Sequence, residues 1–324
     1  MRFLVAGGCG FVGSHVCRRL VGEGREVTCV DNLLTGRREN VGDLIGRPGF
    51  AFIEADVTAL EQSALSGEPP DVILHLASPA SPVDYDRLPL ETLAVNSAGT
   101  WRLLEIAADV GARLVYVSTS EVYGDPLVHP QPETYWGNVD PIGPRSCYDE
   151  GKRFGEALVT SFRRARGVRA AIVRVFNTYG PAMRLDDGRV VPEFLAAAMA
   201  GRPLPLQGDG TQTRSYMYVS DLVEGLVRVA TDGDLDGLVL NIGNSQEITV
   251  RELAERLLII TGSSVGIALV PGRPGDPQQR CPDISRMTER YGWRPVVSLD
   301  DGLRRMVDWL RTTEAPRAPA QGGD

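Results

Sequence analysis

The sequence predicts an α/β protein: a doubly wound parallel sheet followed by a smaller mixed α/β part. Three observations lead to this prediction. Short apolar runs alternate with helical patterns over the first 120 residues, the runs are apolar nearly throughout, and a glycine-rich turn follows the first of them. Strands without a polar face are buried on both sides, as in a parallel sheet covered by helices.

The expected elements alternate as in a doubly wound sheet. Strands are expected at 2–6, 26–31, 50–55, 71–76, 112–118, 170–176 and 238–242. Helices with apolar residues three or four apart are expected at 12–22, 91–109, 147–165, 192–200, 219–231, 249–262 and 299–312. Long loops are expected at 181–191, 201–216 and 271–283.

Long loops become frequent from about residue 178 onward, and this change in the pattern of the chain predicts two domains. Residues 1–177, with a return segment at about 217–245, form the expected sheet domain, and 178–216 and 246–313 form the smaller substrate-binding domain. The tail 314–324 is rich in Pro, Ala and Gly without periodicity, so we expect it to be disordered.

Composition excludes several classes of partner. The 324 residues carry 42 acidic and 34 basic side chains, and the net charge of -8 repels phosphate backbones, so no nucleic acid is expected. No apolar run approaches the ~18 residues of a membrane helix. The N-terminal run is too short for a signal peptide. We therefore expect a soluble, cytoplasmic protein without a membrane partner.

The cysteines are typical of a reducing compartment. They stand at 9, 17, 29, 147 and 281, with no C-x-x-C pair, and their odd number and wide scatter argue against a disulfide framework. With only three histidines in the chain, we expect no metal site.

The glycine-rich turn predicts a dinucleotide site. Gly7, Gly10 and Gly13 have G-x-x-G-x-x-G spacing between a strand and a helix, where backbone N–H groups can bind a pyrophosphate. Asp31 ends the next strand and can accept a hydrogen bond from a ribose 2′-hydroxyl. NAD is therefore favoured, although Arg37 and Arg38 leave NADP open. The other expected cofactor residues are Phe11, Val12, Asn32, Gly36, Asp56, Val57, Leu76, Ala77, Ser78, Tyr148 and Lys152.

A tyrosine and the single lysine form the expected reaction centre. Of the 34 basic residues 33 are Arg, and Lys152 is the exception. Tyr148 lies four residues before it, so the two project from one helix face. An ammonium and an oxidised nicotinamide would lower the pKa of the phenol, which makes Tyr148 a plausible base for a substrate hydroxyl. Thr119 or Ser120 is expected to hold the same oxygen.

In this order the motifs resemble the extended short-chain dehydrogenase/reductase family, over residues 1 to about 312. This resemblance implies a Rossmann domain that keeps NAD bound and a second domain that binds a nucleotide sugar. The longer runs are similar to the branch that decarboxylates UDP-glucuronate; they lie at 119–126, 129–131, 135–138, 143–152, 176–181 and 208–214.

The resemblance implies conversion of UDP-glucuronate to UDP-xylose through a 4-keto sugar, by oxidation at C4, loss of CO₂ and reduction at C4. The catalytic residues so implied are Thr119, Ser120, Glu121, Tyr148, Lys152 and Arg280. Glu121 would handle a proton or order water near C5, and Arg280 would lie near the substrate carboxylate. The expected substrate residues are Pro79, Tyr85, Glu121, Asn177, Arg189, Arg214, Arg273 and Arg280. A homodimer through a bundle that includes 91–109 and 147–165 is also implied.

Alternatives remain open on the sequence alone. A UDP- or dTDP-sugar 4-epimerase or 4,6-dehydratase shares the Tyr/Lys pair, although family dehydratases usually carry Asp-Glu where this chain has Ser120-Glu121. A non-catalytic NAD(H) sensor on the same fold is a more remote alternative. His75 is expected in the core, and Arg145 either contacts substrate or packs.

Overall fold

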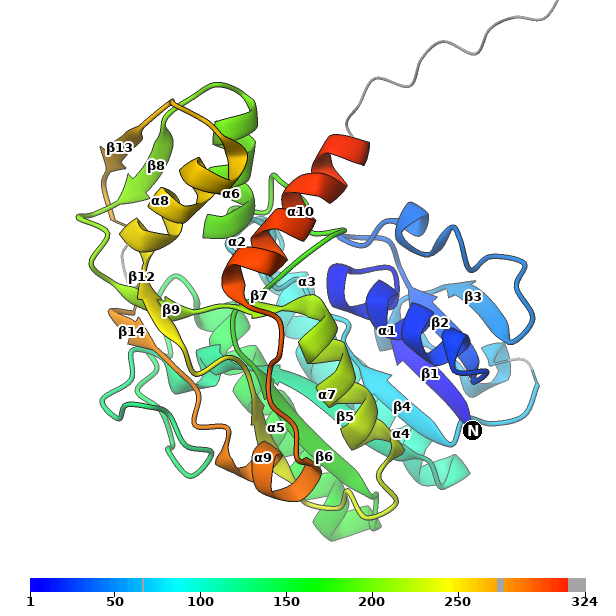
Figure 1. Ribbon diagram of the computed structural model, residues 1–324. Coiled ribbons are helices and arrows are strands. Elements are labelled where there is room, and N and C mark those ends of the chain that lie inside the picture. Colours follow the sequence, from blue (N-terminus) through cyan, green and yellow to red (C-terminus); the bar gives the residue numbers. More distant parts are fainter. Residues whose placement is uncertain (66, 273–276, 314–324) are drawn as a thin grey trace, which may run out of the picture.

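The computed structural model describes residues 1–65, 67–272 and 277–313. The tail at 314–324 and the candidate substrate residue Arg273 lie outside the described residues. Figure 1 shows a parallel sheet with helices on both faces and a smaller group of elements beyond the carboxyl ends of its strands.

The central sheet has seven strands in the order β11-β6-β5-β4-β1-β2-β3. They are β1 (Arg2–Ala6), β2 (Glu26–Asp31), β3 (Phe50–Glu54), β4 (Val72–His75), β5 (Arg113–Thr119), β6 (Ala170–Val175) and β11 (Val239–Ile242). Each neighbouring pair is parallel, and Phe3 of β1 is in register with Val27 on one side and Val72 on the other. The predicted fold class is therefore confirmed, and every predicted strand forms.

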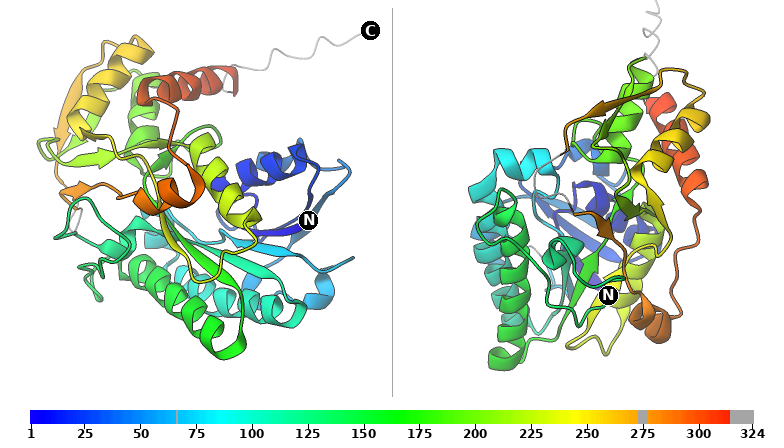
Figure 2. Two further views of the ribbon diagram at one scale, coloured as in Figure 1. Left: turned by 60° about the horizontal axis from the view of Figure 1, so that its bottom comes forward. Right: turned by 90° about the vertical axis from the view of Figure 1, so that its left-hand side faces the viewer.

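Successive side chains of a strand enter two different cores. The helices that cover the sheet are α1 (Phe11–Gly22), α4 (Thr100–Val110), α5 (Ser146–Arg166) and α7 (Val219–Thr231). Phe3 packs in the core that contains residues of α1 and α7, whereas Leu4 packs in the core that contains residues of α4 and α5. Since neighbouring strand residues point to opposite faces, an apolar run fills both cores. Figure 2 shows α5 and α7 on opposite faces of the sheet.

The helix expected at 91–109 is interrupted. The structure has α3 (Pro89–Ala94), a π turn η4 (Val95–Gly99) and then α4. Asn96 in this turn is fully buried and donates hydrogen bonds to the Thr92 carbonyl at 2.8 Å and to Ser78 Oγ at 2.9 Å. A π turn adds only one residue to a helix, so the apolar pattern of the sequence does not reveal it.

The smaller part contains short sheets and further helices. Its strands, and the short pair that joins it to the main sheet, are β7 (Thr178–Tyr179), β8 (Leu204–Gln207), β9 (Thr213–Ser215), β10 (Met217–Tyr218), β12 (Glu247–Thr249), β13 (Ile267–Val270) and β14 (Gln279–Arg280). The remaining helices are α2 (Pro82–Arg87), α6 (Val190–Met199), α8 (Val250–Thr261), α9 (Ser285–Tyr291) and α10 (Leu299–Thr313), and the 3₁₀ turns are η1 (Arg38–Val41), η2 (Val57–Ala59), η3 (Gln62–Ala64) and η5 (Ser120–Tyr123).

Two of the expected loops are wrong in part. β8 and β9 lie within 201–216, and β14 lies within 271–283. These strands have two to four residues, too few to show the alternation by which a strand is recognised in sequence. Within the described ranges, the structure has no helix with the length and apolarity needed to cross a membrane.

A buried ion pair between Arg174 and Glu156 holds the start of the segment that follows β5. Arg174 of β6 donates to both carboxylate oxygens of Glu156 on α5, at 2.9 and 2.6 Å, and both side chains are only 13% exposed. Ser118 Oγ donates to the same carboxylate at 2.7 Å. Arg174 also donates to Tyr123 Oη at 3.0 Å, so the Arg174–Glu156 pair joins β5, β6, α5 and η5.

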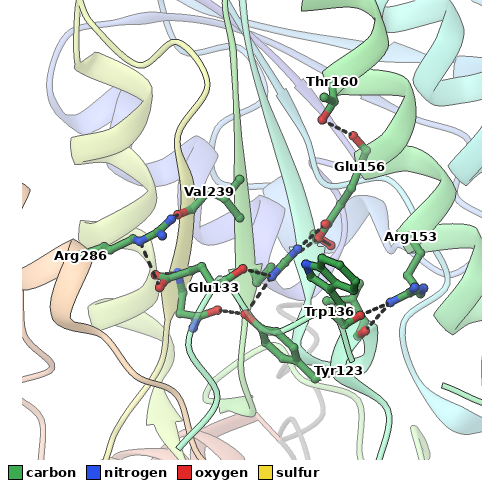
Figure 3. Close-up of polar contacts among 12 residues, drawn as sticks. Tyr123, Glu133, Trp136, Arg153, Glu156, Thr160, Val239 and Arg286 are labelled. Carbon is green, nitrogen blue, oxygen red and sulfur yellow. Dashed lines mark hydrogen bonds and ion pairs between the residues drawn. The ribbon is translucent and has the colours of Figure 1, made fainter. Parts of the chain in front are cut away.

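Further polar contacts extend this network toward the 124–145 segment (Figure 3). The Tyr123 hydroxyl donates to Asn241 Oδ1 at 2.8 Å, and the Asn241 backbone N–H donates to Glu133 Oε1 at 2.9 Å. Arg153 donates to the carbonyls of Val122 and Trp136, at 3.0 and 2.7 Å. The end of β5 is thus held on several sides by hydrogen bonds, of which those of Asn241 with Tyr123 and Glu133 are buried.

Glu156→Gln should lower the free energy of unfolding by about 3 kcal/mol, because it leaves the Arg174 charge buried without its carboxylate. Urea denaturation followed by circular dichroism measures this loss. The control is Glu150→Gln on the same helix, whose carboxylate lies 3.5 Å from Arg153 and is 38% exposed. It should cost less than about 1 kcal/mol. Equal losses for the two variants would contradict the anchoring role of Glu156.

Candidate active site

A cavity of about 730 Å³ lies between the carboxyl edge of the sheet and the smaller part. Its walls come from the ends of β1, β4, β5 and β6 and from α5, α6 and β8. Open parallel sheets bind their ligands at this edge. We therefore expect the predicted site residues to line this cavity.

The structure brings most of those residues to one cavity. Its lining includes Gly7, Gly10, Phe11, Val12, Gly13, Leu76, Ser78, Tyr85, Thr119, Ser120, Glu121, Tyr148, Lys152, Asn177, Arg189, Arg214 and Arg280. The candidates that do not line it are Asp31, Asn32, Gly36, Asp56, Val57, Ala77 and Pro79. Most of this second group belongs to or follows β2, β3 or β4, beside the glycine turn.

The glycine turn lets the backbone approach closely at two positions. Gly7 has φ +80°, and a Cβ there would lie 2.6 Å from the Ala77 backbone nitrogen. A Cβ on Gly13 would lie 2.1 Å from the Gly7 carbonyl oxygen. α1 begins at Phe11, so its unpaired N–H groups face the cavity edge where an anion is stabilised.

Asp31 is held rigidly at the end of β2. Its carboxylate accepts hydrogen bonds from the backbone N–H groups of Cys9 at 2.9 Å and Leu33 at 2.8 Å. Burial raises the pKa of Asp31 and these two hydrogen bonds oppose the rise. A Cβ on Gly36 would lie 2.8 Å from Asp31 Oδ1, so Gly36 keeps space around the carboxylate. Next along the chain, Asn32 donates to Asp56 Oδ2 at 2.9 Å.

These residues fit NAD. The glycine cradle suits a pyrophosphate at the α1 N-terminus, and the Asp31 carboxylate suits a free ribose 2′-hydroxyl rather than a 2′-phosphate. Arg37 lines the cavity, whereas the Arg38 guanidinium lies over the Phe52 ring, 5.3 Å from its centroid. Arg38 is therefore engaged away from a 2′-phosphate.

Tyr148 and Lys152 lie on one face of α5, and both are buried. Lys152 Nζ donates to the Val117 carbonyl at 3.0 Å and lies 5.0 Å from the centroid of the Tyr116 ring. Burial lowers the pKa of Lys152 to about 7, opposed by the charge of Glu156. This amine can therefore change its charge near neutral pH.

Burial dominates the acidity of the Tyr148 phenol in the protein alone. Burial raises the pKa of Tyr148 to about 12, although a hydrogen bond with Thr119 lowers it in part. In the protein alone, therefore, Tyr148 is a neutral phenol at pH 7, and the lowering of its pKa by an ammonium and an oxidised nicotinamide stays a prediction. Its ring stacks on Tyr85, with centroids 5.2 Å apart and planes inclined by 10°. This stacking fixes the ring plane and leaves its hydroxyl end toward Thr119.

Glu121 is bound by two arginines. It follows β5 in the turn η5, where its backbone N–H donates to Thr119 Oγ1 at 3.2 Å. One carboxylate oxygen accepts from Arg145 and the other from Arg280. Burial opposes ionisation, but the charges of Arg280 and Arg145 outweigh it and lower the pKa of Glu121 to about 2. Glu121 is thus an anion at neutral pH, and Arg145 belongs to the site rather than to remote packing.

The other candidates have varied surroundings. Arg189 binds Asp187 through Nε at 2.9 Å. Arg214 donates to backbone carbonyls, including that of Pro277 at 2.6 Å, and still lines the cavity. The expected core position of His75 is confirmed: it is fully buried and interacts with Thr100 Oγ1 at 3.0 Å.

Sequence reasoning missed some groups at the cavity. Arg184 and Asp84 both line it and form an ion pair at 2.8 Å. They are 100 residues apart in the chain, and no motif joins them. Asp149 stands between Tyr148 and Lys152 in the chain and is 7% exposed, but it does not line the cavity.

Comparisons with known proteins agree with this geometry. Residues 3–243 match the model of the NAD dependent epimerase/dehydratase family. UDP-glucuronic acid decarboxylase 6 of Arabidopsis thaliana is 51% identical over 312 residues, which cover 96% of this chain and 89% of that protein.

Solved structures are also similar to this chain over nearly its whole length. The UDP-glucose 4-epimerase of Thermotoga maritima, solved with UDP-glucose, is 33% identical with a TM-score of 0.88, covering 97% of this chain and 99% of the other. The UDP-glucuronic acid 4-epimerase of Bacillus cereus, solved with UDP-glucuronic acid and NAD, is 28% identical with a TM-score of 0.86, covering 97% and 100%.

Gly13→Ala should weaken NAD binding by about 10- to 100-fold, because the new methyl group clashes with the Gly7 carbonyl and displaces the turn. Titration of NAD with the purified variant measures the change. Gly22→Ala at the end of the same helix is the matched control, since a Cβ there meets no atom within 4 Å. Unchanged NAD affinity in Gly13→Ala would refute the assignment of this turn to the cofactor.

Proposed function

This chain belongs to the NAD dependent epimerase/dehydratase family, and we propose that it converts UDP-glucuronate to UDP-xylose and CO₂ with bound NAD. The observation that carries the proposal is the Glu121 carboxylate, held between Arg145 and Arg280 in the cavity that contains Tyr148 and Lys152. The named relative at 51% identity is a UDP-glucuronic acid decarboxylase, which supports the same substrate.

Each of the two parts of the chain binds a different ligand. We assign NAD to 1–177 with the return segment 217–245, and the nucleotide sugar to 178–216 and 246–313. Gly7 and Gly13 supply the cradle for the pyrophosphate of NAD, and Asp31 the acceptor for its ribose. Arg189 and Arg214 line the cavity from the second part and suit the diphosphate or ribose of UDP.

Oxidation at C4 needs a base for the 4-hydroxyl. Tyr148 takes that proton, and Thr119 and Ser120 hold the same oxygen by hydrogen bonds. Held by the glycine turn and Asp31, NAD would supply the hydride acceptor for C4 and the hydride donor once CO₂ has left. A buried phenol with a pKa of about 12 requires a nearby positive charge to ionise, and Lys152 supplies one from the same face of α5.

The decarboxylation follows from the position of the new ketone. C4 is β to the C6 carboxylate, so the C5–C6 bond breaks with its electrons moving toward the ketone oxygen and CO₂ leaves. C5 then takes a proton. Glu121 is ionised in the protein, so we assign it to ordering a water near C5 and to disfavouring the substrate carboxylate, rather than to donating a proton. Arg280 orients the substrate carboxylate before it leaves.

We further propose a homodimer through α4 and α5. Trp101 of α4 and Phe154 of α5 are 50% and 51% exposed and line one shallow hollow together with Leu158. Leu90 of α3 is 74% exposed nearby on the chain. Exposed aromatic side chains of this size commonly mark an interface. The five free cysteines support a reducing compartment, and we assign the enzyme to the cytoplasm.

Incubation with UDP-glucuronate and NAD should give a UDP-pentose, lighter than the substrate by one CO₂, without net NADH. Mass spectrometry of the nucleotide sugar and absorbance of NADH measure both. An accumulating UDP-4-ketopentose with stoichiometric NADH would remove the return hydride step. Unchanged mass with altered stereochemistry would indicate an epimerase, and loss of water from a sugar nucleotide a dehydratase. NAD binding without turnover of any of these sugars would favour a sensor.

Lys152→Arg should lower kcat by about 100-fold or more despite the retained charge. The buried site holds a compact ammonium against the Val117 carbonyl, and a planar guanidinium cannot occupy it without displacing α5. Initial rates at saturating UDP-glucuronate give kcat. Arg164→Lys, an exposed change on the same helix, is the control and should retain full activity. A fully active Lys152→Arg enzyme would show that any cation serves.

A further inference from the structure

The guanidinium of Arg184 joins two walls of the cavity that lie on either side of the glycine turn. Arg184 belongs to the segment 181–191, which leads from β7 to the smaller part of the chain. Its Nη2 atom donates to Asp84 Oδ1 on α2 at 2.8 Å. Its Nη1 atom donates to the carbonyl of Thr35, which follows β2, at 3.4 Å. One side chain of the segment thus bridges two elements of the sheet domain.

The order of the strands places this bridge across the end of β1. In the sheet, β1 lies between β4 and β2, and the glycine turn follows β1. Since α2 follows β4 and Thr35 follows β2, a side chain that contacts both spans the strand between them. Arg184, Asp84 and Thr35 line the same cavity as Gly7 and Gly13. The bridge therefore lies at the edge of the sheet where the cofactor residues are gathered.

A second contact holds the same segment against α1. The carbonyl of Pro181 lies 2.9 Å from His15 Nε2 on α1, and because a carbonyl can only accept, this nitrogen is the donor. Between the two attachments, Ala182 has φ +67°, a conformation that residues with a Cβ rarely adopt. Surroundings that hold the backbone on both sides are what keeps a residue in such a conformation. The segment is therefore held closely against the elements that surround the glycine turn.

The partners of Arg184 make it a tie between elements rather than a ligand for phosphate. Besides Asp84, its guanidinium lies 3.2 Å from Asp186 Oδ1 within its own segment. Asp84 is 5% exposed, and its other carboxylate oxygen accepts from Ser81 Oγ at 2.8 Å, which fixes its orientation. A guanidinium that faces two carboxylates has little positive charge left for a pyrophosphate.

We propose that the Arg184–Asp84 pair is a gate on the cofactor site: it holds the segment 181–191 across the glycine turn, and NAD enters or leaves when the pair opens. A hydride that is taken up and then returned requires the same NAD to stay through both steps, and this need rests on the proposed function. The gate itself acts on NAD alone and involves no sugar.

A gate has a kinetic signature that a binding residue lacks. An element that blocks the path slows association and dissociation alike, so its removal speeds both and changes the dissociation constant little. A side chain that binds NAD directly acts mainly on the dissociation rate, and its removal weakens affinity.

Stopped-flow fluorescence of NADH measures both rates on the purified full chain, with no nucleotide sugar present and with excess NAD to displace bound NADH. Arg184→Gln should speed association and dissociation by about tenfold each, the effect of one partly buried ion pair on a barrier. The dissociation constant should change less than about threefold. Arg87→Gln is the matched control, because Arg87 lies 3.7 Å from the same Asp84 carboxylate and is 64% exposed. Its rates should equal those of the unaltered protein.

Asp84→Asn opens the same pair from the other side and should speed both rates to the same extent. The double variant with Arg184→Gln should be no faster than either single variant, because both substitutions remove one interaction. Asp84 lies in the first turn of α2, so circular dichroism checks that this variant folds. Arg184→Gln changes a loop residue and tests the gate independently.

Three results would overturn the gate. The first is unchanged rates in Arg184→Gln. The second is faster dissociation with unchanged association, which would make Arg184 a ligand of NAD. The third is a double variant about as fast as the product of the two single effects, which would show that Arg184 and Asp84 act separately. These measurements use no sugar, so they leave the proposed decarboxylation standing, and failure of that reaction in the mass-spectrometric assay leaves the gate standing.

Discussion

Buried charge is the constraint around which the carboxyl edge of this sheet is organised. Cavity walls made of parallel strands and helices exclude water, so each ion there needs a partner of opposite charge or a set of hydrogen bonds. Arg174 meets that need with both oxygens of Glu156, and Glu121 meets it with two arginines. Lys152 has one carbonyl and an aromatic face as partners, and burial lowers its pKa to about 7. The strength of each pairing decides which groups keep their charge and which exchange protons.

Much of the fold follows from local pattern. Apolar runs predicted all seven strands of the central sheet, because a strand buried on both faces has to be apolar on both faces. The glycines at 7 and 13 and the Tyr148/Lys152 pair were found because close backbone approach and a shared helix face each require a fixed spacing. The structure places these motifs around one cavity.

The rest depends on contacts between distant segments, which spacing does not encode. Arg184 meets Asp84 across 100 residues, and Arg145 joins Glu121 only after the 124–145 segment folds back. The acid–base properties depend on such contacts too. Burial raises the pKa of Tyr148 to about 12 in the protein alone, whereas the lowered pKa expected from the sequence involves an oxidised nicotinamide as well as an ammonium. Desolvation is a property of the whole fold, so a motif does not reveal its size.

The solitary lysine has a practical consequence. With 33 arginines and one lysine, the protein displays no primary amine on its surface apart from the N-terminus. Amine-directed reagents label, immobilise or cross-link most proteins at many positions. In this protein they have one lysine side chain to attack, and Lys152 lines the cavity. Burial lowers the pKa of this amine to about 7, so it loses its proton at a lower pH than an ordinary lysine. Acylation therefore reports on this cavity, and a ligand that covers Lys152 leaves the N-terminus as the primary amine that still reacts.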